Sequence, residues 1–104
     1  MLELINLERT NRGIRPITWD ESIRTGARNH SENMLERGSL FHASGPFAEC
    51  CFMSSSSWAS AKDIVEGWMS STTGHREILL DPRYVRGAAG IARDGSLYAT
   101  YRCY

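Results

Sequence analysis

The stretch GIARDGSLYATYRC, residues 90–103, decides the fold class, because it holds an Asp94-Gly95 pair between two strand-like runs. An Asp-Gly pair in this setting is the commonest signature of a tight two-residue turn in a β-hairpin. We therefore expect residues 90–103 to form two neighbouring antiparallel strands.

A further strand is expected at FAECCFM, residues 47–53, a mostly apolar run that contains one acid, Glu49. The stretch before it, FHASGPF, contains Ser, Gly and Pro, which favours a loop, and this loop carries His42. An isolated ionised carboxylate is too costly to bury. We therefore expect Glu49 to face water, a cleft or a partner.

Two helices are expected before this strand. A short one begins near Leu2 and ends at the turn-permissive NRG of residues 11–13. A longer one, over about residues 20–37, has two candidate N-caps: Thr18-x-x-Glu21 has the spacing of a capping box, and Asp20 competes with it. Its apolar stripe and its C-terminal glycine are Ile23, Ala27, His30, Met34 and Gly38. We interpret His30 as a histidine packed at the boundary of the core rather than as a ligand.

A third helix is expected over about residues 60–72. Its apolar face consists of Ile64, Val65, Trp68 and Met69. Glu66 falls roughly 130° from the centre of that face at 100° per residue, so it belongs to the polar flank. His75 begins the next helical turn, which Asp81-Pro82 ends.

The composition indicates one domain and excludes several classes of protein. The chain has 104 residues, of which 41% are hydrophobic, and twelve basic residues balance twelve acidic ones. Without a basic patch, nucleic acid is not expected as a partner. No apolar run approaches the roughly 20 residues that cross a bilayer. The opening MLELINLERTNRG also lacks the apolar run of a signal peptide.

The three cysteines leave two interpretations open. Cys50 and Cys51 are adjacent, and neighbours on a strand point to opposite faces, so Cys103 could pair with only one of them. Alternatively, all three are small buried hydrophobes in a reducing environment. Zinc binding by Cys50-Cys51 is not expected, because the pair lacks the two-residue spacer of zinc motifs.

Together these segments resemble a CAP-superfamily domain, also called an SCP domain, of the short prokaryotic type. The superfamily includes cysteine-rich secretory proteins, venom antigen-five proteins and plant pathogenesis-related proteins. The resemblance extends from about residue 3 to residue 103. Its carriers are INLERTNRGIRPITWD (5–20), ARNHSENM (27–34), FH (41–42), AEC (48–50), VEGWMSS (65–71), GHREILL (74–80) and the closing GIA and YAT.

The resemblance implies a single CAP/SCP-like domain over residues 1–104, with an α+β fold in which a three-layer α-β-α sandwich surrounds a central antiparallel sheet. It also implies a cleft with two histidines and two glutamates, here His42, Glu49, Glu66 and His75. Two imidazoles and two carboxylates suit zinc or another divalent cation. The histidines would be direct ligands, and a carboxylate would complete the shell or orient a histidine.

The family resemblance leaves the function open between classes. One hypothesis is an extracellular recognition or ligand-binding domain, with a lipid, a sterol or a surface partner as ligand, acting as a monomer. The alternative is a zinc-dependent hydrolase in which Glu49 or Glu66 is the general base toward a metal-bound water. A third interpretation treats the His/Glu cluster as a structural brace. By analogy with short prokaryotic relatives, any disulfide is expected to join Cys51, not Cys50, to Cys103.

Overall fold

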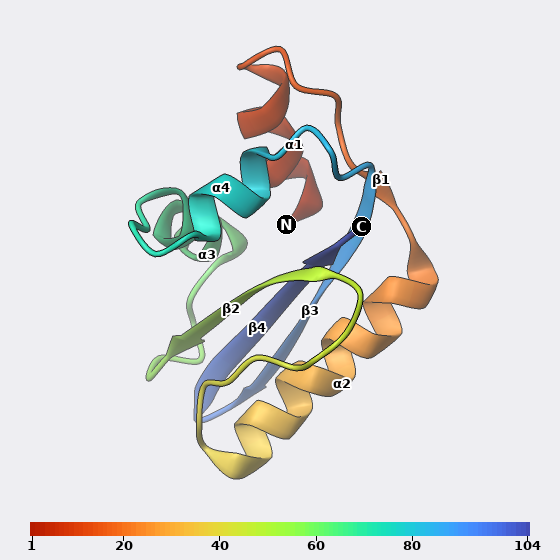
Figure 1. The fold of residues 1–104 in the computed structure, drawn as a ribbon. Coiled ribbons are helices and arrows are strands. Elements are labelled where there is room, and N and C mark those ends of the chain that lie inside the picture. Colours follow the sequence, from red (N-terminus) through yellow and green to blue (C-terminus); the bar gives the residue numbers. More distant parts are fainter.

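The structure, a computed structural model that describes residues 1–104, has a four-stranded sheet with helices on both faces (Figure 1). The strands are β1 (Thr18–Trp19), β2 (Ala48–Ser54), β3 (Arg86–Asp94) and β4 (Ser96–Cys103). They lie in the order β1-β3-β4-β2. The pairs β2–β4 and β3–β4 are antiparallel, and the short β1 pairs in parallel with β3. The central antiparallel sheet is therefore confirmed.

The helices form the two outer layers. Helix α2 (Glu21–Arg37) packs along one face, against β3 and β4. The opposite face carries α1 (Leu2–Thr10), α3 (Ala61–Met69) and α4 (His75–Leu80), which Figure 1 shows grouped together. This arrangement confirms the expected α-β-α sandwich. None of the four helices has the length and apolarity that a membrane span requires.

The helix ends follow the sequence signals, and the structure decides between Thr18 and Asp20 as the N-cap of α2. Asp20 is the N-cap of α2, and its side chain accepts a hydrogen bond from the Ser22 backbone N–H. Thr18 is part of β1 and does not cap the helix. Gly38 ends α2 in the left-handed conformation, with φ of 64°. At α3, Ser60 and Asp63 form a capping box.

The hairpin is confirmed, but the expected two-residue turn is wrong. Asp94 pairs with Ser96, so only Gly95 lies between the strands, with φ of 74°. The register pairs Arg93 with Leu97, and Leu97 is fully buried in the core. A slip by one residue would turn Leu97 to the other face of the sheet, so burial fixes the tighter turn.

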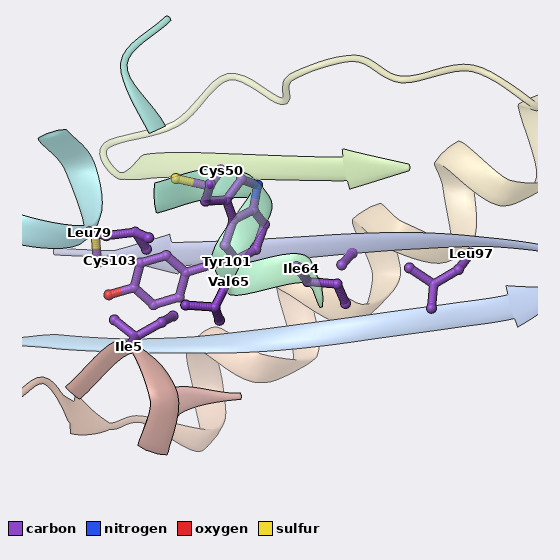
Figure 2. Packing of buried hydrophobic residues seen from close by; sticks show 10 residues of the cluster. Ile5, Cys50, Ile64, Val65, Leu79, Leu97, Tyr101 and Cys103 are labelled. Atoms are coloured by element: carbon purple, nitrogen blue, oxygen red, sulfur yellow. The ribbon is translucent and has the colours of Figure 1, made fainter. Parts of the chain in front are cut away.

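The main core lies between the sheet and helices α1, α3 and α4 (Figure 2). Its buried members are Ile5, Cys50, Ile64, Val65, Trp68, Leu79, Leu97, Ala99, Tyr101 and Cys103. A smaller cluster on the α2 side consists of Met34, Cys51 and Tyr98. Helix α2 approaches β3 closely: a Cβ on Gly90 would lie 2.4 Å from the Cα of Arg28. Any larger residue at position 90 would therefore push α2 away from the sheet.

The three cysteines are free, and the sheet separates them into two groups. Cys50 and Cys103 belong to the main core, and Figure 2 shows both among its apolar residues. Cys51 points to the α2 side. The expected pairing of Cys51 with Cys103 is therefore wrong, because alternation along two paired strands places the two side chains on opposite faces.

A buried arginine, Arg9, joins α1 to the segment that follows α4. Its guanidinium donates to the carbonyl oxygens of Leu79 at 2.9 Å, Asp81 at 3.0 Å and Tyr84 at 3.1 Å, and also to that of Arg15 at 2.8 Å. The Arg9 side chain is fully buried, so water cannot replace its guanidinium as the donor to these carbonyl groups. Arg9 therefore fixes the position of α1 over the main core.

We expect Arg9→Met to lower the free energy of unfolding by about 3 kcal/mol or more, because several buried carbonyl groups would lose their donor. Arg12 is a matched control, since it lies on the same helix end but pairs with Glu8 at the surface. Arg12→Met should cost less than about 1 kcal/mol. Urea denaturation of both variants measures the difference, and equal losses would contradict the role of Arg9.

We also expect all three thiols to be free and unreactive in the folded protein, because each cysteine is buried. A thiol reagent should titrate three groups after denaturation without reductant and essentially none before it. Burial also raises the pKa of Cys103 to about 11, which keeps this thiol protonated and slow to react. A Cys51–Cys103 crosslink in peptide mapping would show that the sheet register is different.

Candidate functional site

The carboxylate of Glu49 is the centre of a polar cluster on the α2 side of the sheet. Glu49 lies directly opposite Arg102 in the pairing of β2 with β4, so both side chains share one face. The Nε atom of Arg102 donates to Oε2 of Glu49 at 2.8 Å. Only 4% of the Glu49 side chain is exposed. Of the three surroundings expected for Glu49, which were water, a cleft or a partner, the structure shows a partner, Arg102.

The second oxygen of Glu49, Oε1, accepts from several neighbours. They are His42 Nδ1 at 2.9 Å, the backbone N–H of Ala43 at 3.0 Å and the Sγ atom of Cys51 at 3.3 Å. Burial by itself would raise the pKa of Glu49, but the hydrogen bonds from His42, Arg102 and Ala43 outweigh it and hold the pKa below the ordinary 4.5. Glu49 is therefore an anion at neutral pH.

His42 is positioned by the loop between α2 and β2, which runs beside β2 in Figure 1. Since Glu49 is ionised and can only accept, Nδ1 of His42 carries the proton of their 2.9 Å hydrogen bond. The other ring nitrogen, Nε2, takes no part in that hydrogen bond. The His42 side chain is 61% exposed. His42 thus presents to solvent a ring whose orientation Glu49 fixes.

His75 is the first residue of α4 and follows Gly74, whose φ of 110° turns the chain into the helix. Its Nδ1 atom forms a hydrogen bond with the Ser71 hydroxyl at 2.8 Å. Burial, and next the nearby His42, hold the pKa of His75 below its ordinary 6.5. His75 is therefore mainly neutral at pH 7.

An open groove of about 470 Å³ lies beside His75. One wall is the segment from Ser70 to Thr73, and the other is formed by β2 residues, including Met53. Leu40 and Met53 are large apolar side chains exposed at 53% and 44%. The groove therefore combines hydroxyl groups with exposed apolar surface.

Glu66 lies apart from this cluster. It is on the polar flank of α3, as expected, with its side chain 63% exposed and 3.8 Å from the Nζ atom of Lys62. It lines a separate pocket of about 170 Å³ with residues of α1, including Leu4 and Leu7. The structure thus brings Glu49 and His42 into contact, joins His75 to Ser71, and directs Glu66 toward α1.

Sequence reasoning missed two further members of the cluster, His30 and Cys51. His30 does pack at the edge of the core, and its Nε2 atom lies 2.7 Å from the carbonyl oxygen of Phe41. The same atom is 3.8 Å from Oε1 of Glu49. The ligand atoms of His30, Glu49 and Cys51 lie within 4.8 Å of one another, so this group could hold a metal ion. The two-residue spacing of Glu49 and Cys51 on a strand was a usable signal for their shared face.

Comparison with known proteins agrees with the fold. The sequence profile of the cysteine-rich secretory protein family, CAP, matches residues 2–104. The uncharacterized protein YkwD of Bacillus subtilis is 28% identical over 112 residues, which cover 94% of this chain and 43% of YkwD. The chain therefore spans less than half of the length of that relative.

Two solved structures share the fold. An extracellular SCP-domain protein from Bacillus anthracis superposes with a TM-score of 0.75 at 19% identity, over 96% of this chain and 38% of that one. The crystal structure of NaASP2 with Zn²⁺ gives a TM-score of 0.69 at 17% identity, over 86% of this chain and 60% of that one. The sheet order, the helical layers and the profile match lead to one conclusion: the chain belongs to the cysteine-rich secretory protein (CAP) family.

Proposed function

We propose that this domain binds a divalent cation, zinc in the first place, through Nε2 of His42 and Nε2 of His75, and serves as an extracellular ligand-binding domain. The observation that carries the proposal is the 2.9 Å hydrogen bond between His42 Nδ1 and Glu49 Oε1. A carboxylate that holds one nitrogen of a histidine fixes the ring and raises the basicity of the other nitrogen, as in many zinc sites.

The donor atoms fit zinc. Each of the two rings has Nδ1 in a hydrogen bond, His42 with Glu49 and His75 with Ser71, which leaves both Nε2 atoms as candidate ligands. Neutral imidazole is a preferred ligand of zinc. NaASP2, a protein of the same fold, was crystallised with Zn²⁺. In this chain Glu49 would orient His42, and Glu66 would take no direct part.

The groove beside His75 is the proposed binding place for the ligand. Its exposed apolar side chains, Leu40 and Met53, and its hydroxyl groups suit an amphipathic molecule such as a lipid or sterol. The extracellular description of the SCP-domain protein from B. anthracis supports a location outside the cell.

Hydrolysis has weaker support than binding. A general base needs a carboxylate oxygen free to accept a proton from water. Both oxygens of Glu49 are already bound by protein donors, with Arg102 on Oε2, and Glu66 lies beside Lys62 in another pocket. The geometry therefore favours Glu49 as an orienting group.

We expect zinc titration calorimetry to detect a binding event that His42→Ala and His75→Ala each abolish. Glu49→Gln should weaken this event by about 10- to 100-fold, the usual effect of losing an orienting carboxylate. Glu66→Gln should change it by less than about threefold, because its exposed pair with Lys62 has little energy.

The double variant His42→Ala/His75→Ala is the control for a shared ion. Its loss of zinc affinity should be no greater than that of either single variant, because two ligands of one ion act as a unit. Two independent, additive losses would contradict the proposal. An unchanged binding event in either single variant would do the same.

The proposal needs Glu49 to stay ionised, which predicts a pH dependence of stability in chelator-treated protein. Because the folded-state pKa of Glu49 lies below 4.5, its stabilising effect is complete above that pH and is lost as the pH falls through the folded-state value. The difference in free energy of unfolding between wild type and Glu49→Gln should therefore narrow in acid. Glu66→Gln, measured in parallel, should show a small difference at every pH, and a constant Glu49→Gln difference would contradict burial of an anion.

A further inference from the structure

We propose that His30, Glu49 and Cys51 form a second, buried zinc site on the α2 side of the sheet. The inference goes beyond the ion proposed for His42 and His75, since it uses two residues, His30 and Cys51, that have no part in that site. Only Glu49 is common to both, as a direct ligand here and as an orienting group there.

The spacing of the donor atoms is that of a tetrahedral zinc site. Zinc bonds of about 2.0–2.3 Å in a tetrahedron separate neighbouring ligand atoms by roughly 3.3–3.7 Å. In the structure Cys51 Sγ lies 3.3 Å from Glu49 Oε1, and His30 Nε2 lies 3.8 Å from the same oxygen. All three donor atoms are within 4.8 Å of one another. To bind the ion, Nε2 of His30 would give up its 2.7 Å hydrogen bond to the carbonyl oxygen of Phe41.

Two elements of the fold hold these donors together. Glu49 and Cys51 are two residues apart on β2, so both side chains point toward α2. His30 comes from α2 itself and faces the sheet with 5% of its side chain exposed. Arg102 donates a hydrogen bond to Oε2 of Glu49. The other oxygen, Oε1, is the one that His42 and Cys51 contact.

The donor set selects for zinc and against calcium or magnesium. Sulfur, imidazole nitrogen and a single carboxylate oxygen suit a borderline-soft ion, whereas calcium and magnesium take oxygen ligands. Binding would release one proton, from the Cys51 thiol to solvent, and would move the His30 proton from Nε2 to Nδ1. Glu49 and the Cys51 thiolate would place two negative charges next to the ion, and Arg102 would remain paired with Oε2 of Glu49.

His42 gives the buried donors a route to solvent. Its Nδ1 atom lies 3.7 Å from Cys51 Sγ, and its side chain is 61% exposed. The cluster is therefore covered on this side by one surface residue and not by the core. The other thiols have no such surroundings, because Cys50 and Cys103 lie in the apolar cluster on the opposite face.

Cobalt(II) titration of the reduced protein tests the site, because thiolate ligation of Co²⁺ gives an intense charge-transfer absorption in the near ultraviolet that imidazole and carboxylate ligands do not give. Wild type should show this absorption, and added Zn²⁺ should remove it. Cys51→Ala should abolish it, and His30→Ala should weaken Co²⁺ binding by more than about tenfold.

Matched variants separate this site from the one proposed for the exposed histidines. Cys50→Ala removes the neighbouring thiol on the other face and should leave the absorption intact, and so should His75→Ala. Circular dichroism checks that each variant is folded. If Cys51→Ala does not fold, His30→Gln is used in its place. The proposal is overturned if saturating Co²⁺ gives no thiolate absorption in wild type, or if the absorption depends on Cys50 and not on Cys51. If wild type shows the cobalt-thiolate absorption but no zinc-binding event that depends on His42 and His75, only the proposed function is overturned.

Discussion

The ion pair between Glu49 and Arg102 is the interaction on which the polar half of this domain depends. A carboxylate at this depth is too costly to bury alone. Because β2 and β4 place Arg102 directly opposite, the charge is compensated within the sheet itself. The remaining oxygen of Glu49 can then orient the His42 ring and accept from the loop backbone at Ala43. One cross-strand pair thus helps to position the loop between α2 and β2.

The sheet divides the domain into an apolar face and a polar face. Toward α1, α3 and α4 it presents the main core, in which Arg9 is the one buried charged side chain and binds carbonyl groups. Toward α2 it presents Glu49, Thr100 and Arg102 beside the smaller cluster of Met34, Cys51 and Tyr98. Stability and chemistry are therefore carried by opposite faces of the same strands. This separation explains why adjacent Cys50 and Cys51 have different surroundings.

The candidate site spans a gradient from buried to exposed groups. Glu49 and His30 are almost fully enclosed, His75 is partly buried, and His42 is at the surface. Low exposure keeps the carboxylate interactions strong, because solvent screens them little. The exposed ring of His42 connects this enclosed network with solvent. Cys51 belongs to the same network, since its Sγ atom lies 3.7 Å from His42 Nδ1 and 3.3 Å from Glu49 Oε1.

The sequence by itself determined the elements and marked several polar groups, because periodicity, caps and turns act over a few residues. The layers were implied by the family resemblance. Asp94-Gly95 predicted the hairpin, the stripe through Met34 predicted α2, and an acid in an apolar strand marked Glu49 as unusual. Only the tertiary structure decided which groups meet. Arg102 and His30 are far from Glu49 in sequence, and no local pattern encodes strand register or the rotation of a helix over a sheet. Cys51 faces Glu49 and not Cys103 for the same reason: the alternation of side chains is local, but the face that each set occupies is fixed by the burial of the whole core.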